Sequence, residues 1–371
     1  MKLKIAAFLV VLFGTTTLLA FVAGEIYVRR KQSYIVAEQD NQRRLGFVEQ
    51  NPGLLIRNTA KGKRLIPGAK VVIKNHYLSG RDIPVRINSL GFRGDDVAAE
   101  PRPGVPRILM LGDSITWGDY VRDEETYVKQ TANVLETTLG YPVDVINGGV
   151  GDTGSQEHID ILEESGLQIH PDIVVLGFYL NDSRPPWGFS GELLERNWVR
   201  RHSLLVDKVY EKFVLWQWIQ RQGPDRFAWV DAQRRLDWKG DHAAFLELAR
   251  LAQYDWGAAW VEDSWRTVDQ ELTRLEHDAR RNGFRVATLT FPVRFQVYAE
   301  SPEDSPQQTF AALAQKHGFS NLDLLPLYRA HAGEEILFDQ CHPTAAMNRT
   351  IGAAVADFLR DNVQQVRAAH E

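Results

Sequence analysis

Short apolar runs alternate with longer amphipathic stretches over the C-terminal two thirds of the chain. Five apolar-rich runs each have the length of one buried strand: Ile108–Leu111, Val143–Ile146, Ile173–Phe178, Arg285–Thr290 and Asn321–Leu325. Apolar residues recur at helical spacing in the stretches Tyr127–Leu139, Gln270–Asn282, Phe310–His317 and Thr350–Arg360. Strands that alternate with helices predict an α/β fold, a three-layer α/β/α sandwich around a central parallel sheet.

The N-terminal pattern is different, because Ile5–Ala23 runs for 19 residues without a charged side chain. A helix of that length would be about 28 Å long, close to the thickness of a bilayer core. Two export signals fit this run: an uncleaved transmembrane signal anchor over residues 1–31, or a signal peptide cleaved near Val22–Gly24. We favour the anchor, because the run is longer than the apolar region of a usual signal peptide. Basic residues flank both ends almost equally, so the charges do not fix the orientation.

Between the apolar run and the first core strand we expect an N-terminal extension and linker over residues 32–106. Ser33–Asp96 is expected to be irregular and strand-rich, with short β-like runs at Lys70–Lys74 and Pro84–Ile87. Asn88–Arg93 is interpreted as a turn that seats Phe92 in the core. The remaining residues, 107–371, form the α/β domain, which carries an insertion over residues 183–264.

The insertion is rich in tryptophan: nine of the ten tryptophans lie between Trp187 and Trp265. Leu204–Ile219 has a helical apolar stripe, so the insertion is predicted to be mostly helical. Two interpretations remain open. The aromatic residues form the core of a small helical subdomain, or they cap a site, with Trp216 and Trp218 facing a sugar, an acyl chain or a membrane.

Composition narrows the classes of function. The net charge of −5 over 371 residues gives no reason to expect a nucleic-acid partner. The charge is uneven, with 16 basic and 8 acidic residues in the first 100 against 27 and 40 in the rest. A single cysteine excludes an internal disulfide and a multi-cysteine metal site. The histidines outside the motifs below show no ligand spacing, so we expect no metal and no cofactor.

Two short motifs carry residues suited to nucleophilic catalysis. Gly112-Asp113-Ser114 interrupts the first apolar strand, which places the serine at the carboxyl edge of the predicted sheet, where open α/β sheets bind ligands. A helix is expected to begin just after this turn. By itself the tripeptide also fits a capped turn with no catalytic role. Near the C-terminus, Asp339 and His342 stand three residues apart, which places both side chains on one face of a turn or short helix. Together they supply a base for the serine and an acid to orient that base.

Three blocks of sequence resemble the SGNH (GDSL-type) hydrolases, in particular their membrane-anchored bacterial members. The blocks are RILMLGDSITWG at Arg107–Gly118, Asn181-Asp182 after an apolar strand, and Asp339-x-x-His342-Pro343. The resemblance runs in order from about Asn88 to Leu359, apart from the insertion. It implies a flavodoxin-like sandwich with no cofactor. It also implies a domain held on the periplasmic side of the inner membrane by a single-pass helix.

The resemblance also assigns roles to residues. Ser114 would be the nucleophile, His342 the general base and Asp339 its partner. The oxyanion hole would consist of the Ser114 N–H, the Gly151 N–H and the Asn181 side-chain amide. The glycine loop is one residue shorter than the usual pattern, so Gly149 and Gly154 remain alternatives to Gly151. Cys341 is interpreted as a packed side chain and not as a second nucleophile.

The expected activity is hydrolysis of an acyl ester, such as an O-acetyl ester of an envelope polysaccharide, with a carbohydrate or acyl chain as the bound partner. An O-acyltransferase that uses the same triad is the alternative. A membrane-tethered scaffold without enzymatic activity is an alternative of another class, although it would have no need of Ser114, Asn181, Asp339 and His342 together. The sequence does not separate hydrolase from transferase, since that depends on how water reaches the acyl-enzyme.

Overall fold

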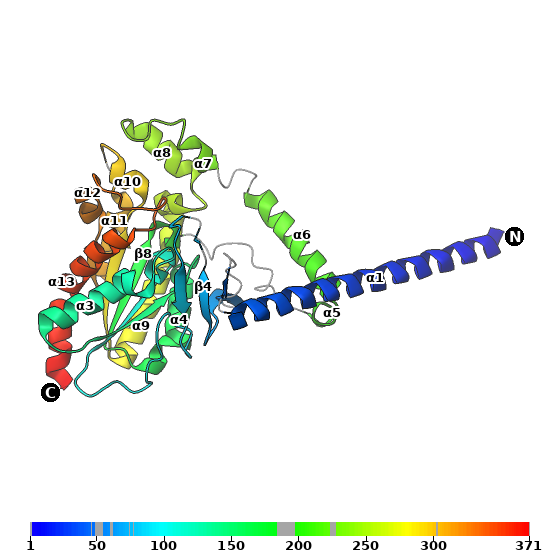
Figure 1. Ribbon diagram of the computed structural model, residues 1–371. Helices are drawn as coiled ribbons and strands as arrows, with labels where there is room; N and C mark the ends of the chain where they lie inside the picture. Colours follow the sequence, from blue (N-terminus) through cyan, green and yellow to red (C-terminus); the bar gives the residue numbers. More distant parts are fainter. Residues whose placement is uncertain are drawn as a thin grey trace.

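The chain folds into an α/β domain from which one long helix projects (Figure 1). It is known here from a computed structural model. The structure describes residues 2–45, 47–48, 55–59, 62–73, 75–76, 78–183, 197–222, 228–301 and 303–370. The helix, α1 (Lys2–Leu45), points away from the domain and carries the N-terminus at its far end.

The core of the domain is a parallel five-stranded sheet in the order β10-β9-β8-β6-β7. Its strands in chain order are β6 (Arg107–Gly112), β7 (Asp144–Gly149), β8 (Ile173–Tyr179), β9 (Arg285–Phe291) and β10 (Ser320–Asp323). Every residue of β6 and of β8 is buried, as expected for central strands covered on both faces. The predicted sheet is therefore confirmed, with each strand within a few residues of its expected place.

Helices cover both faces of this sheet and make the three layers. On one face, α3 (Tyr127–Leu139) packs against α13 (Ala345–His370). On the other face, α4 (Ser155–Glu164) and α11 (Ser305–Lys316) both pack against α9 (Glu262–Asn282). The chain leaves β6 toward β7 on one side and later returns to β8 on the other. This reversal makes the carboxyl end of β6 a topological switch point, the usual ligand position in such sheets.

The N-terminal helix is longer than predicted. Residues Ala7–Arg30 are apolar and long enough to cross a bilayer, with a mean hydropathy of 2.2 and no part of the most apolar window buried against the protein. The helix then continues to Leu45, so the expectation of irregular structure from Ser33 onward is wrong for its first thirteen residues. The stretch from Glu38 to Arg44 is entirely polar, so no apolar stripe marks a helix there in the sequence.

Strand-rich structure begins after this helix. A three-stranded sheet has the order β1-β4-β5, with β1 (Phe47–Val48), β4 (Lys70–Ile73) and β5 (Ile83–Arg86), and β2 (Ile56–Thr59) pairs with β3 (Gly62–Leu65) in a hairpin. Asn88 accepts hydrogen bonds from the backbone N–H groups of Leu90 and Phe92, and the Phe92 side chain is buried. The turn that seats Phe92 in the core is thus confirmed.

The described part of the insertion is helical and divides into two halves. The first half, α5 (Trp198–His202) and α6 (Leu204–Gln222), lies against α1. The second half consists of α7 (Ala228–Ala232), α8 (His242–Leu251) and the 3-10 helix η6 (Trp256–Trp260), which pack on the α/β domain. Trp187 and the side chain of Trp218 lie outside the described residues.

Candidate active site

Three neighbouring strands deliver the residues that the sequence singled out. The central strand of the three, β6, ends at Gly112 and is flanked by β7 and β8. Ser114 follows β6, Gly151 follows β7, and Asn181 lies in the 3-10 helix η4 (Leu180–Ser183) that follows β8. Because the strands are parallel, all three residues lie at one edge of the sheet.

The turn that holds Ser114 depends on a close approach of backbone and side chains. A Cβ at Gly112 would overlap the Thr116 side chain and would lie 2.9 Å from the carbonyl oxygen of Gly177 on β8. Only glycine fits this position. The Asp113 carboxylate then accepts a hydrogen bond of 2.9 Å from the N–H of Ile115 and caps the turn.

The helix expected behind Ser114 is only one turn long, α2 (Ser114–Trp117), and it ends at Gly118 in a left-handed conformation. The expected helix thus begins directly after the turn, and it is short. A single turn has almost no macrodipole, so stabilisation of negative charge at Ser114 has to come from individual donors instead.

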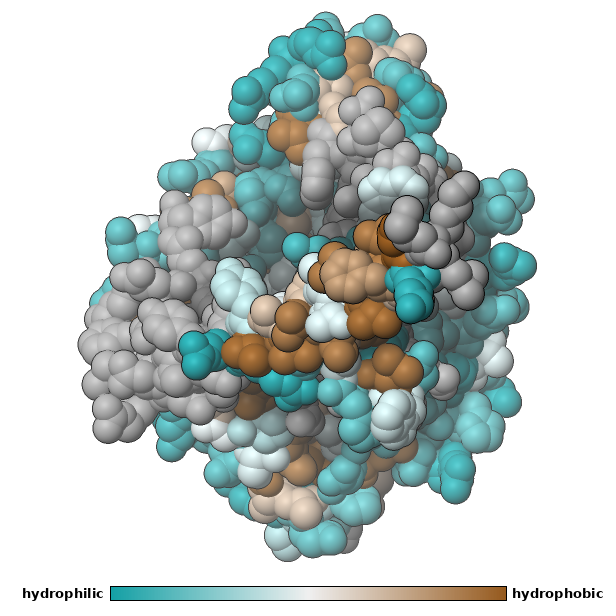
Figure 2. Space-filling view, turned by 90° about the vertical axis from the view of Figure 1, so that its right-hand side faces the viewer, coloured by the Kyte–Doolittle hydropathy of each residue, from teal (hydrophilic) through white to brown (hydrophobic). Residues whose placement is uncertain are grey.

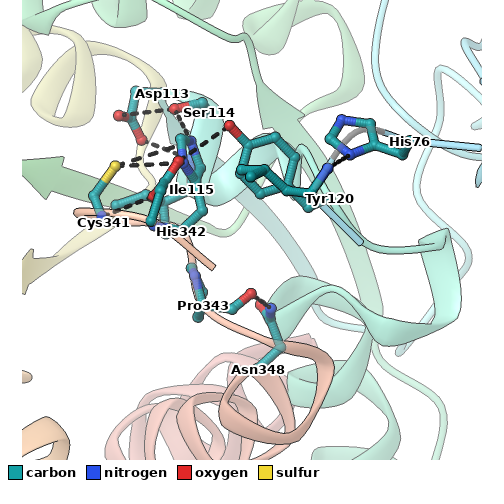
Figure 3. A network of polar contacts seen from close by, with 11 residues as sticks. His76, Asp113, Ser114, Ile115, Tyr120, Cys341, His342, Pro343 and Asn348 are labelled. Atoms are coloured by element: carbon teal, nitrogen blue, oxygen red, sulfur yellow. Dashed lines mark hydrogen bonds and ion pairs between the residues drawn. The ribbon is translucent and has the colours of Figure 1, made fainter. Parts of the chain in front are cut away.

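His342 and Asp339 complete a continuous hydrogen-bonded line with Ser114. Figure 3 shows the side chains of Ser114 and His342 beside each other in this line. The Ser114 Oγ lies 2.8 Å from Nε2 of His342, and Nδ1 of His342 lies 2.7 Å from Oδ2 of Asp339. An ionised carboxylate only accepts hydrogen bonds, so the ring proton lies on Nδ1. In the neutral imidazole this leaves Nε2 as the acceptor for the serine hydroxyl. The structure thus brings together three residues that are up to 228 positions apart in the chain.

Asp339 and His342 lie in a turn, which is one of the two possibilities, a turn or a short helix, that the sequence left open. Oδ1 of Asp339 accepts hydrogen bonds of 2.9 Å from the backbone N–H groups of both Cys341 and His342. This turn around the aspartate side chain fixes the backbone of the base, while the other carboxylate oxygen remains for the imidazole.

Opposing effects set the pKa values of this pair. Burial raises the pKa of Asp339, but the hydrogen bonds from His342 and from the two backbone N–H groups outweigh it and bring the pKa to about 2. Burial lowers the pKa of His342, yet the hydrogen bond and charge of Asp339 outweigh that and raise it above 6.5. Asp339 therefore stays ionised at neutral pH, and His342 is a stronger base than free imidazole.

Tyr120 is a neighbour of the pair that the sequence analysis missed. Its hydroxyl donates a hydrogen bond of 3.1 Å to Oδ2 of Asp339. Its ring centroid lies 4.5 Å from that of the His342 imidazole, and both side chains are labelled in Figure 3. On its other side the ring contacts His76 from the N-terminal extension, at 4.6 Å between centroids. The position of Tyr120, six residues after Ser114, was the only signal available in the sequence.

Arg93 is a second residue that the sequence analysis missed. Its buried guanidinium donates to the carbonyl oxygens of Trp117, Gly118 and Val121 and lies 4.6 Å above the Trp117 ring. These carbonyls lie at the end of the one-turn helix α2 and just after it, so the N-terminal extension holds the end of the nucleophile turn in place. The basic side chain next to Phe92 carried no sequence signal for this role.

The three candidate glycines differ in what their N–H groups do. The Gly149 N–H donates to Oδ1 of Asn147 at 3.0 Å, and the Gly154 N–H donates to the Glu157 carboxylate at 3.0 Å. Both groups are therefore engaged away from Ser114. Gly151 lies beside the nucleophile, since a Cβ built on it would be 4.0 Å from Cβ of Ser114. Of the three glycines, Gly151 is the one whose position suits an oxyanion donor.

The Asn181 turn is held rigidly by the residue that follows it. Oδ2 of Asp182 accepts a hydrogen bond of 2.9 Å from the Tyr179 N–H, and the Asp182 carbonyl oxygen accepts one of 3.0 Å from Ser155. The buried amide oxygen of Asn181, by contrast, has no hydrogen-bond partner among the residues that the structure describes. The backbone of the Asn181 turn is thus held in place by Asp182.

Cys341 is buried beside the base, with its sulfur 3.4 Å from Nδ1 of His342. Asp339, Cys341 and His342 present ligand atoms within 4.8 Å of one another, as a metal site would. However, burial raises the pKa of the Cys341 thiol well above 9.0, and metals bind the thiolate form. The other two side chains, Asp339 and His342, form a hydrogen bond with each other. These properties favour a packed thiol, and the absence of a metal site stays a prediction.

The second half of the insertion borders this edge of the sheet. Helix η6 packs against η4, which carries Asn181. Three tryptophans of this half of the insertion gather around Phe295, with ring centroids 4.9 Å away for Trp238 and Trp256 and 6.0 Å away for Trp229. Buried aromatic packing of this kind fits the helical-subdomain interpretation. Trp216, in the first half, is instead 56% exposed on α6.

Comparisons with other proteins find likeness in structure only. No family profile and no curated protein matches the sequence. Among solved structures, a two-domain esterase active on acetylated mannans matches with 16% identity over 72% of this chain and a TM-score of 0.40. This chain spans 50% of the length of that protein. An acetyl xylan esterase variant from Geobacillus stearothermophilus has 14% identity, 70% and 96% coverage of the two chains and a TM-score of 0.41.

A lipase/acylhydrolase from Enterococcus faecalis has 17% identity, 70% and 97% coverage and a TM-score of 0.38. All three likenesses are distant. The chemistry assigned below therefore rests on the positions of this chain's own residues.

Proposed function

We propose that this protein is a serine ester hydrolase of the SGNH type. The observation that carries the proposal is the line of hydrogen bonds from Ser114 Oγ through the imidazole of His342 to Asp339, with lengths of 2.8 and 2.7 Å. It lies at the switch point of the sheet. Such a nucleophile, base and orienting acid form the constellation of acyl-transfer enzymes.

The residues have separate roles in the proposed reaction. His342 Nε2 takes the hydroxyl proton as Ser114 Oγ bonds to the ester carbonyl carbon, and Asp339 stabilises the imidazolium that forms. The tetrahedral intermediate collapses, the alcohol leaves with the proton from His342, and the acyl group stays on Ser114. A water molecule then attacks the acyl-enzyme with His342 again as base, which releases the carboxylic acid and restores the serine.

The negative oxygen of the intermediate needs donors in fixed positions. We assign this role to the N–H groups of Ser114 and Gly151 and to the Asn181 amide, because these groups come from the ends of three adjacent strands. The rigid turn at Asp182 supports the assignment, since a donor that is already oriented loses no free energy to reorganisation.

Asn181→Ala should therefore reduce kcat by about 100- to 1,000-fold, the usual loss for one oxyanion donor. The KM should change little, because the oxyanion forms only after binding. Steady-state kinetics with p-nitrophenyl acetate measure both values. Asn133→Ala, at an exposed position on α3, is the matched asparagine control and should leave kcat unchanged. A kcat within tenfold of wild type in Asn181→Ala would remove Asn181 from the oxyanion hole.

We further propose that α1 anchors the enzyme in the inner membrane, with the α/β domain on the periplasmic side, and that its substrate is an O-acetyl ester of an envelope polysaccharide. The exposed apolar surface of Ala7–Arg30 supports anchorage. The orientation and substrate are those that the sequence resemblance implies.

A charged, membrane-impermeant fluorophosphonate tests activity and orientation together. In intact spheroplasts it should label the full-length protein, and peptide mapping should find the adduct on Ser114. Labelling only after lysis would reverse the orientation, and labelling at another serine would refute the assignment of the nucleophile. Incubation with acetylated glycans then distinguishes a hydrolase from an acyltransferase. A hydrolase, the expected result, releases acetate, whereas an acyltransferase transfers acetyl groups to a second glycan.

A further inference from the structure

Helices α5 and α6 form a compact unit that is separate from the α/β domain. The Arg200 guanidinium on α5 donates a hydrogen bond of 2.9 Å to the Asp207 carboxylate on α6, and both side chains are buried. The same guanidinium lies 4.3 Å above the ring of Tyr210. These contacts fix the two helices relative to each other.

This unit is fastened to α1 near the end of the apolar segment. The Glu25 carboxylate accepts hydrogen bonds of 3.0 and 2.9 Å from the N–H groups of Leu204 and Leu205, the first residues of α6, and one of 2.8 Å from the Ser203 hydroxyl. Arg29 pairs with the same carboxylate and also donates to the carbonyl oxygen of His202. Glu25, an unusual residue inside a long apolar segment, thus caps α6.

The outer face of the α5–α6 unit is apolar and aromatic. Val209, Phe213 and Trp216 follow helical spacing on α6 and are 60%, 50% and 56% exposed. Trp198 on α5 is 71% exposed. Figure 2 looks toward the N-terminal end of α1, whose exposed apolar residues contribute to the hydrophobic area near the centre of this view.

We propose that α5 and α6 lie in the surface of the lipid bilayer, as a second membrane contact beside the span. The proposal rests on the proposed anchorage by α1. Glu25 lies five residues before Arg30, the end of the apolar segment, which is about 8 Å along a helix. Interfacial helices sit about 5–10 Å into the headgroup and acyl boundary, so the capped end of α6 is at the right depth.

Direction and composition agree with this placement. In the view of Figure 1, α6 runs across the direction of α1, as a helix along the bilayer surface would beside a span. Tryptophan and tyrosine concentrate at membrane interfaces, where an apolar ring body meets water at its polar edge. Lys212, exposed on the same helix, extends its charge toward the headgroups from such a position. A water-soluble partner would not explain why the face adjoins the end of an exposed apolar helix.

The consequence concerns the catalytic domain. A domain tethered by one span rotates freely about it, whereas a span and an interfacial helix fixed to each other by Glu25 hold one orientation. The proposed interfacial helix leads along the chain to α7, α8 and η6, the part of the insertion that packs beside Asn181. The insertion would then join the membrane surface to the mouth of the site.

Depth-dependent quenching in vesicles tests the proposal on the full-length protein. An NBD fluorophore is placed on Phe213→Cys in α6, on Leu9→Cys in α1, or on Ala353→Cys in α13, which is exposed and lies on the side of the domain away from α1. Cys341 is only 3% exposed and does not compete for the label. Each protein is reconstituted in vesicles of phosphatidylcholine and phosphatidylglycerol that contain doxyl-labelled lipid.

The label at position 213 should lose fluorescence, most strongly with the quencher placed high on the acyl chain. The label at position 9 should be quenched best by a deep quencher, and the label at position 353 should not be quenched. Quenching at 9 without quenching at 213 would overturn the interfacial helix and leave the anchor intact. No quenching at either position would overturn the anchor itself and the proposal with it.

A second variant tests the link between the two contacts. Glu25→Ala removes the cap of α6 but leaves the apolar segment complete. The shallow quenching of the label at position 213 should then weaken, while quenching at position 9 stays the same. Unchanged quenching at 213 in this variant would show that Glu25 does not hold α6 at the surface.

Discussion

Ser114→Ala is expected to reduce kcat for p-nitrophenyl acetate by about 10⁵- to 10⁶-fold, the loss seen when a serine hydrolase is deprived of its nucleophile. The physical reason is that no other described oxygen nucleophile lies within hydrogen-bond distance of Nε2 of His342. Residual activity should remain, because oxyanion donors still polarise the ester carbonyl for attack by water. Stopped or continuous assays on the purified full-length protein measure the change.

The folded state of this variant should be unaffected. Ser114 is partly exposed, and its Oγ has only one short hydrogen bond, the one to His342. Thermal unfolding should therefore occur at nearly the wild-type temperature. Ser301→Ala, at an exposed serine, serves as the matched control and should retain full activity and fluorophosphonate labelling. If Ser114→Ala keeps more than a tenth of wild-type kcat, the proposed triad is wrong.

Asp339→Asn should reduce kcat by about 10⁴-fold near neutral pH. An asparagine amide that donates to Nδ1 of His342 would force the ring proton onto Nε2. The base would then present a hydrogen to Ser114 Oγ in place of a lone pair. The positions of the side chains would be preserved, but the imidazole would be in the wrong tautomer. The loss in kcat should therefore be large even though the variant folds normally.

The pH profile gives this variant a second signature. In the wild type, kcat/KM should fall as the pH drops through the pKa of His342, which Asp339 raises above 6.5, because only the neutral imidazole accepts the serine proton. Asp339 itself, with a pKa of about 2, stays ionised over that range. In Asp339→Asn the charge that raises the pKa of His342 is gone while burial, which lowers it, remains. The acid limb should move to lower pH.

Tyr120→Phe is the control for the pH experiment. It removes one hydrogen bond to Asp339 but keeps the carboxylate charge and the ring packed against His342. It should lower kcat far less than Asp339→Asn and leave the acid limb above 6.5. An acid limb in Asp339→Asn at the same pH as in wild type would mean that another group controls the titration.

The sequence by itself determined the layered α/β fold and the residues at the strand ends. Parallel strands covered on both faces need continuous apolar runs, so β6 and β8 are visible as local patterns without any knowledge of their neighbours. The turn at Gly112 is also a local feature of the sequence, because glycine ends the apolar strand there and Asp113 caps the residues that follow. Asp339 and His342 were found because one turn of backbone brings both side chains to the same face.

Only the tertiary structure decided which groups surround the triad. Gly149, Gly151 and Gly154 are alike in sequence, and they differ in what their N–H groups contact across the fold. Tyr120 and Arg93 act through contacts with residues far along the chain. The insertion looked like one tryptophan-rich segment, yet one half packs beside Asn181 and the other is capped by Glu25. Local patterns report burial and backbone conformation, whereas hydrogen-bond partners between distant segments depend on how the layers pack, and that is set by the whole chain at once.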